Sequence, residues 1–200
     1  YKRITNRYES AVLTGKGLAW GGSQVRTEAT GYRTVFFAQE MLGEVGESLD
    51  GRRVVISGSG NVALYAAEKA IALGANVVAV SDSGGYVYEE AGIDLDLLKD
   101  VKEQRRERLT AYATDRGGAA RHVAGGSIWE VPCDIALPCA TQNELDENAA
   151  RALVAGGARL VAEGANMPST PGAIEVLQGA GVLFAPGKAS NAGGVATSAL

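Results

Sequence analysis

Histidine and cysteine are scarce in this chain of 200 residues, which contains one histidine and two cysteines. Because His122 is the only histidine, a zinc site of the usual type lacks ligands and a histidine-based catalytic triad is poorly supplied. The spacing of Cys133 and Cys139 matches no common zinc pattern, and their apolar neighbours favour buried, reduced thiols. We therefore expect no metal site.

Long apolar runs and an excess of positive charge are also missing. No apolar stretch approaches the roughly 20 residues that a membrane-spanning helix needs. The net charge of −4 argues against nucleic acid as the main partner. The sequence has no signal peptide and starts at Tyr1, which indicates a fragment or a processed chain rather than export. We expect a cytoplasmic protein.

Glycine, by contrast, is abundant, and its most informative pattern begins at residue 58. The apolar run Val54–Ile56 leads into Gly58-Ser59-Gly60-Asn61-Val62-Ala63, after which an apolar helical pattern begins. Strand, turn and helix in this order are the context that a dinucleotide-binding motif requires. The first glycine allows a tight turn, the second lets the backbone approach a pyrophosphate, and the helix N-terminus attracts the phosphates. Residues 58–62 are therefore predicted to bind a dinucleotide cofactor.

A second strand is predicted over residues 76–81, and it ends in Ser81-Asp82-Ser83-Gly84-Gly85. In NAD-binding units an acidic side chain about 20 residues beyond the glycines holds the ribose 2′-hydroxyl. A carboxylate there would repel a 2′-phosphate, whereas serine hydroxyls can donate to one. The pattern favours NADP over NAD, and a simple turn rich in Asp, Ser and Gly is the alternative.

A polar helix is predicted from Asp94, with Leu95, Leu98, Val101 and Leu109 on one face. Its surface is basic, and such a surface is usually no more than a solvated helix face. Beside a 2′-phosphate, one or two of these cations would complete NADP selectivity. The cations are Lys99, Lys102, Arg105, Arg106 and Arg108. Residues 115–127 are expected to form a loop and residues 128–129 a short strand.

The rest of the chain alternates strands and helices. We expect strands at 133–138, 160–162 and 182–185, a helix at 144–155, and another from Thr170-Pro171, where a capping hydroxyl precedes proline. A helix should also begin after Arg26, capped by Thr27 or Thr30. Polar loops at 140–143, 164–166 and 187–194 follow three strands, so they should converge on the cofactor.

These patterns predict an α/β fold of the Rossmann-like, doubly wound type, with a mostly parallel sheet and helices on both faces. We divide the chain into a connecting arm, 1–25, and a dinucleotide-binding domain, 26–200.

Several longer strings make the chain resemble hexameric NADP-dependent glutamate dehydrogenases, relatives of the leucine, valine and phenylalanine dehydrogenases. The strings are Gly15-Lys16-Gly17, Arg26 to Gly31, the Gly58 motif, Ser81-Asp82-Ser83, Cys133 to Asp146, Val161 to Pro168 and Asn191 to Ser198. The resemblance covers nearly the whole chain. It implies that L-glutamate, NADP⁺ and water are converted to 2-oxoglutarate, ammonia and NADPH.

The resemblance also assigns residues. Thr30 and Asn61 match positions that contact the nicotinamide half of the cofactor, and Ser81, Asp82 and Ser83 match the loop at the adenosine ribose. Lys102, with Arg105 or Arg108, is a candidate partner of the 2′-phosphate. Ala140, Thr141 and Asn166, together with Asn191 in the loop at 187–194, would line the cofactor. Ser198 matches a hydroxyl that helps to bind the side-chain carboxylate of the substrate.

Two departures from the family pattern matter. Arg33 stands where the family usually has glycine. The long arginine side chain would either alter close packing there or belong to an altered surface. The lysines and the aspartate that perform catalysis in the family lie in an N-terminal domain that has no counterpart here, so no catalytic residue is assigned. We expect these 200 residues to bind NADP(H) without turnover, as a monomer or dimer rather than the family's homo-hexamer. A stand-alone or engineered dinucleotide-binding module and a related amino-acid dehydrogenase are the alternatives.

Overall fold

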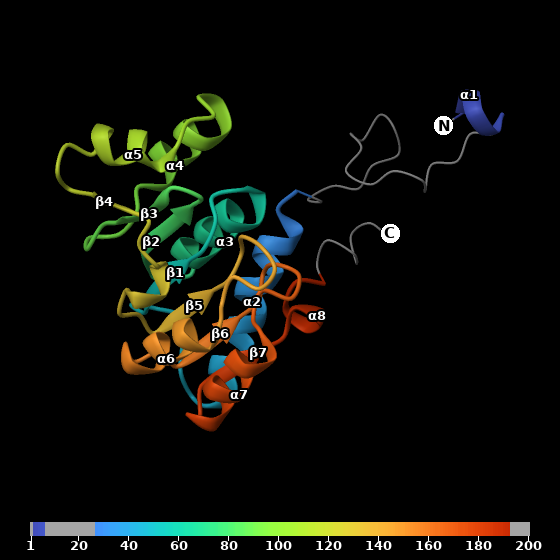
Figure 1. Cartoon of the computed structure of the whole chain (residues 1–200), viewed down its shortest axis with the longest axis vertical. Helices are drawn as coiled ribbons and strands as arrows, with labels where there is room; N and C mark the ends of the chain where they lie inside the picture. The colour runs from blue at the N-terminus through green and yellow to red at the C-terminus, as the bar shows by residue number, and fades with distance from the viewer. Residues whose placement is uncertain (1, 7–26, 193–200) are drawn as a thin grey trace.

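The computed structural model of the protein describes residues 2–6 and 27–192. Within these residues, seven strands form one sheet in the order β4-β3-β2-β1-β5-β6-β7 (Figure 1). The strands are β1 (Arg53–Ile56), β2 (Asn76–Asp82), β3 (Gly85–Tyr88), β4 (Arg121–Ala124), β5 (Ile135–Leu137), β6 (Leu160–Ala162) and β7 (Leu183–Ala185). Strands β2, β1, β5, β6 and β7 pair in parallel, and β3 and β4 add an antiparallel edge. The predicted fold class is confirmed.

Helices cover both faces of this sheet, as a doubly wound fold requires. The longer ones are α2 (Ala29–Glu44), α3 (Asn61–Ala72), α6 (Glu147–Ala155) and α7 (Pro171–Gly179). The shorter ones are α1 (Lys2–Thr5), α4 (Leu95–Lys99), the π-helix η3 (Asp100–Gln104), α5 (Leu109–Asp115), the 3₁₀-helix η4 (Ile128–Glu130) and α8 (Gly187–Ser190).

The side chains of the central strands divide between two apolar cores, one on each face of the sheet. Val54 and Ile56 of β1 pack in the core that also contains the buried side chains of α2 to α5. Val55, between them, packs in the core formed with η4, α6 and α7. The side chains of Val54, Val55 and Ile56 are all fully buried. A parallel strand buried on both faces in this way requires a continuous apolar run.

Helix α2 packs directly on the backbone of α3. A Cβ atom at Gly31 would lie 2.6 Å from both the amide nitrogen of Ala66 and the carbonyl oxygen of Val62, so no side chain fits there. The prediction that Thr27 or Thr30 caps this helix is wrong, because Glu28 is the N-cap residue and its side chain makes no capping hydrogen bond. Arg33 is exposed and its Nε donates to the carbonyl of Ala189 at 3.3 Å, so it belongs to the surface.

The segment from Gly84 to Glu130 differs most from its predicted structure. Strand β4 occupies part of the expected loop at 115–127, and residues 128–129 lie in η4 instead of a strand. The single polar helix expected from Asp94 is divided into α4, η3 and α5, so Leu109 begins a second helix. Antiparallel β3 and β4 hold one another through cross-strand bonds, which no local pattern in this glycine-rich stretch reveals.

The chain order reverses at β1. Strand β2 lies on one side of β1 and β5 on the other, so the carboxyl ends of β1 and β5 border a topological switch point. Open parallel sheets bind ligands in the crevice at this point. The loops that follow β1, β2 and β5 are therefore where a ligand is expected to bind.

Candidate functional site

A cleft of about 780 Å³ opens at the carboxyl ends of β1, β2 and β5. Most of the residues predicted to bind the cofactor line it. They are Gly58, Ser59, Gly60, Asn61, Val62, Ser81, Asp82, Ser83, Lys102, Arg108, Ala140 and Thr141. Two further lining residues, Cys139 and Glu144, were missed by the sequence analysis.

The glycine loop forms the floor of the cleft at the switch point. Gly58 has a φ of 87°, and a Cβ atom there would lie 3.1 Å from the Cα of Ala140. Gly60 is the N-cap residue of the 12-residue helix α3 and makes no side-chain capping bond. No heavy atom lies within 4 Å of a Cβ built at Gly60, so the space beside the start of α3 is open there. Such a helix terminus attracts anionic groups.

At the end of β2, the side chains of Ser81, Asp82 and Ser83 have different hydrogen-bond partners. The Ser81 hydroxyl accepts a hydrogen bond from the amide of Gly58 at 2.9 Å, which ties β2 to the glycine loop. The Asp82 carboxylate accepts from the amide of Gly84 at 2.7 Å and from the amide of Leu109 at 3.0 Å. Both Asp82 oxygens therefore hold backbone, and Ser83 contacts the guanidinium of Arg108.

Of the three candidate partners of the 2′-phosphate, two face the cleft and one does not. Lys102 donates to the carbonyl of Glu107 at 2.7 Å and lines the cleft together with Arg108. Arg105 is an exposed residue that pairs with Asp115 and Glu107 and is not part of the cleft lining. The basic end of the cleft thus consists of Lys102 and Arg108.

The end of β5 carries an acid in place of a cation. One oxygen of Glu144 accepts from the amides of Ala140 and Thr141, at 3.0 and 3.2 Å. Burial raises the pKa of this carboxyl above its ordinary value despite these bonds. Glu144 escaped notice because the sequence placed it at the start of a helix, whereas α6 begins at Glu147. Burial also raises the pKa of the neighbouring Cys139 thiol.

Three other predicted residues lie outside the described lining of the cleft. Thr30 is half-buried in the first turn of α2. Asn191, which follows α8, donates to the side-chain oxygen of Asn166 at 2.9 Å and to the carbonyl of Ala165 at 3.2 Å. The structure therefore brings Asn166 and Asn191 together, beyond β6 and β7. Ser198 lies outside the described residues.

A buried carboxylate, that of Glu163, joins the segments that carry these two asparagines. Glu163, which is 4% exposed, accepts from the amide of Gly187 at 2.6 Å and from the amide of Ser169 at 3.3 Å. The Ser190 hydroxyl donates to the carbonyl of Glu163 at 2.5 Å. These bonds join the loop after β6 to helix α8.

Across residues 2–6 and 27–192, no three side chains of His, Cys, Asp or Glu are grouped so as to hold a metal ion. In the same residues, every helix is too short or too polar to cross a membrane.

Residues 21–200 match the family model for glutamate/leucine/phenylalanine/valine dehydrogenase. The chain is 54% identical over 202 residues to the NADP-specific glutamate dehydrogenase of Haemophilus influenzae, covering all of this chain and 44% of that protein. It is 50% identical over 203 residues to the NAD(P)-specific glutamate dehydrogenase of Xylanibacter ruminicola, again covering the whole chain and 45% of the relative.

The fold is also similar to a solved structure. The crystal structure of a Plasmodium falciparum glutamate dehydrogenase superposes with a TM-score of 0.92 at 44% identity, over 99% of this chain and 43% of that one. The chain therefore spans less than half the length of the relatives that it matches.

Proposed function

The chain belongs to the glutamate/leucine/phenylalanine/valine dehydrogenase family, and on that premise we propose that it is the cofactor-binding part of an NADP-dependent glutamate dehydrogenase. The whole enzyme would convert L-glutamate, NADP⁺ and water to 2-oxoglutarate, ammonia and NADPH. The division into a connecting arm, 1–25, and a dinucleotide-binding domain, 26–200, is part of this proposal.

The observation that carries the choice of NADP is the charge at the β2 end of the cleft. Lys102 and Arg108 line it, beside the hydroxyls of Ser81 and Ser83. The carboxylate of Asp82, which would otherwise repel a phosphate, has both oxygens on backbone amides. A 2′-phosphate would therefore meet two cations and two hydroxyls, which is a favourable set of partners for a phosphate.

The remaining predicted residues would hold the rest of the dinucleotide. The pyrophosphate would lie on residues 58–62 at the N-terminus of α3, where the missing Cβ of Gly60 leaves room. The nicotinamide half would cross the switch point towards Asn61, Ala140 and Thr141, with Thr30, Asn166 and Asn191 at its far edge. When bound, the nicotinamide ring supplies the acceptor for a hydride. The protein residues bind it, orient it and exclude water from one side.

Catalysis requires more than this one wall, because hydride transfer needs the ring, the substrate carbon and a base held in fixed geometry. We assign no base or substrate-binding lysine to this chain, and only Ser198 is proposed to contact substrate. The 200 residues alone are therefore proposed to bind cofactor without glutamate-dependent turnover. Assembly into a homo-hexamer would need the rest of the enzyme. A cytoplasmic location agrees with two free cysteines in a reducing compartment.

The first experiment is calorimetry of the chain with NADPH and with NADH, followed by an assay for NADPH formation from glutamate and NADP⁺. We expect NADPH to bind at least about tenfold more tightly, which corresponds to one charge-assisted contact. Equal affinity for the two cofactors would overturn the choice of NADP, and measurable turnover would overturn the claim that one wall is insufficient.

A pair of lysine variants provides the matched control. Lys102→Ala should lower NADPH affinity about fivefold while leaving NADH affinity unchanged, as expected for a partly solvated phosphate contact. Lys69→Ala removes a lysine from α3 that stacks against Tyr32 and Phe36 and does not line the cleft. It should bind both cofactors as the parent does.

A further inference from the structure

Arg108, one of the two cations at the cleft, ends a segment that has little packing of its own. Every residue from 103 to 108 is exposed, and Arg106 has a φ of 55° in the left-handed region. Arg108 is the last residue of this stretch and the N-cap residue of α5. Its position at the cleft therefore depends on what holds α5.

Helix α5 is held by two anchors, the carboxylate of Asp82 at its start and the carboxylate of Glu89 farther along the helix. At its start, Leu109 is fully buried and its amide donates to Asp82 at 3.0 Å. One turn later, the fully buried Tyr112 donates its hydroxyl to the carboxylate of Glu89 at 2.6 Å. At its end, Arg116 places its Nε 3.0 and 3.1 Å from the two oxygens of the same carboxylate.

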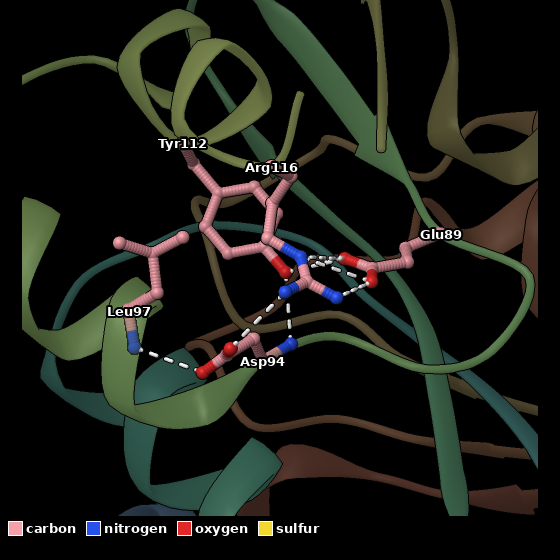
Figure 2. Close-up of polar contacts among 5 residues, drawn as sticks. All are labelled: Glu89, Asp94, Leu97, Tyr112 and Arg116. Carbon is pink, nitrogen blue, oxygen red and sulfur yellow. Dashed lines mark hydrogen bonds and ion pairs between the residues drawn. The ribbon is translucent and has the colours of Figure 1, made fainter. Parts of the chain in front are cut away.

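Glu89 is the centre of this second anchor, and it does not touch the cleft. It follows β3, is 1% exposed, and receives donors from both Tyr112 and Arg116 (Figure 2). Asp94 extends the network, since its amide donates to the Tyr112 hydroxyl at 2.8 Å and its carboxylate pairs with Arg116 at 3.3 Å. The same carboxylate accepts from the amide of Leu97 at 3.0 Å, so the start of α4 is fixed to the end of α5.

We propose that Glu89 is a positioning residue for cofactor selectivity: through Tyr112 and Arg116 it fixes α5, so that Arg108 stays at the 2′-phosphate end of the cleft. This inference rests on the proposed function, because it assumes that the cleft binds NADP(H). The buried carboxylate acts on the cofactor only through α5. NADH, which has no 2′-phosphate, should be indifferent to it.

The test compares NADPH and NADH affinities of the 200-residue chain by calorimetry, with thermal unfolding followed in parallel. Glu89→Gln removes the charge and keeps the shape, and should weaken NADPH binding about tenfold, which is the loss of one charge-assisted contact. NADH affinity should change less than about twofold, because NADH lacks the 2′-phosphate that Arg108 would contact. A loss of affinity shared equally by both cofactors, or no loss, would overturn the proposal.

A second variant keeps the test decisive if Glu89→Gln does not fold. Tyr112→Phe removes one hydroxyl and leaves the Glu89–Arg116 pair, so it should weaken NADPH binding about threefold with NADH unchanged, a partial loss of one hydrogen bond. Unchanged NADPH affinity in this variant would count against the proposal. Glu90→Gln is the matched control: Glu90 is an exposed neighbour that pairs with Arg53 and Tyr88 rather than with α5.

A double variant separates positioning from general loosening. In an Arg108→Ala background the cation is gone, so adding Glu89→Gln should change NADPH affinity less than about twofold, the non-additivity expected of residues that act through one another. Full additivity would overturn the proposal. The parent chain reports on the proposed function itself: if it does not prefer NADPH, the cofactor assignment fails irrespective of Glu89.

Discussion

Cations are present on one side of the cleft and not on the other, although both sides contain carboxylates bound by backbone amides. On the β2–β4 side, Glu89 pairs with the guanidinium of Arg116, and Lys102 and Arg108 face the cleft. On the β5–β7 side, Glu163 accepts from backbone amides, and Glu144 accepts from two backbone amides and shares a hydrogen bond with the Ser57 hydroxyl. Among the described residues neither carboxylate pairs with a cation.

The two kinds of charged group are expected to have different roles: the cations would discriminate between cofactors, and the buried carboxylates support the fold. Charged side chains at a solvated edge can be exchanged with little effect on the sheet, so they can discriminate between two cofactors at low structural cost. A carboxylate that holds amides from separate loops cannot be removed without leaving those amides buried and unpaired. Mutation of the exposed cation Arg108 or of Lys102 should therefore change the binding constants, whereas loss of the Glu163 carboxylate should change the stability.

The largest effect should come from Glu163→Ala. It leaves the amides of Gly187 and Ser169 without an acceptor and opens a cavity, so the free energy of unfolding should fall by about 3 kcal/mol. Urea denaturation measures this. Glu175→Ala, on the exposed side of α7, is the control and should change stability by less than about 0.5 kcal/mol. Lys102→Ala, from the other side of the cleft, should match the control, and an equal loss there would erase the contrast.

A smaller effect is expected where the loops after β5 and β6 pack together. A Cβ atom at Gly164 would lie 2.5 Å from the sulfur of Cys139 and 3.1 Å from Cγ1 of Val62. Gly164→Ala should therefore lower the free energy of unfolding by about 2 kcal/mol through overpacking.

Removing the sulfur should relieve this clash. The double variant Gly164→Ala with Cys139→Ala should be more stable than the sum of its single changes predicts, by about 1 kcal/mol. Gly43→Ala, in α2 with no heavy atom near its Cβ position, should instead be neutral or stabilising. Strict additivity of the pair would show that the loops after β5 and β6 move apart readily.

The smallest effect concerns Glu144, at the border between the two sides. Burial raises the pKa of its carboxyl, so between its ordinary and raised values the folded state binds the proton more tightly than the unfolded state does. Its contribution to stability therefore falls as pH rises through that window. Glu144→Gln keeps an acceptor for the two amides and should stabilise the chain at neutral pH by less than about 1 kcal/mol.

Denaturation at acidic and neutral pH tests this assignment. The difference between Glu144→Gln and the parent should shrink as pH falls below the ordinary range of a glutamate carboxyl. A Glu144→Gln variant that is less stable than the parent at neutral pH would mean that the charge strengthens the two amide bonds more than burial weakens them.

The sequence was most informative where structure depends on neighbouring residues. The apolar run 54–56, the glycine turn after it and the Thr170-Pro171 helix start all lie as predicted, since each is decided within a few residues. The cleft residues after β1, β2 and β5 followed from the same logic, because parallel strands place their carboxyl ends at one edge of the sheet.

The predictions failed where partners are distant in sequence. Asp82 caps backbone at Leu109, 27 positions away, so its engagement cannot be read from the turn that contains it. Glu144 is a local exception: it resembled a helix start, yet its carboxylate accepts from the amides of Ala140 and Thr141 just before it. Strands β3 and β4 exist through their pairing with one another and with β2, which a glycine-rich stretch conceals.

The missing side chain at Gly31 has a mechanical consequence. Because α2 contacts the carbonyl of Val62 in the first turn of α3, no compressible layer of side chains separates the two helices at the cleft. We therefore expect α2 and α3 to move together, so that a displacement of α2 also displaces the loop at residues 58–62 that would hold the pyrophosphate.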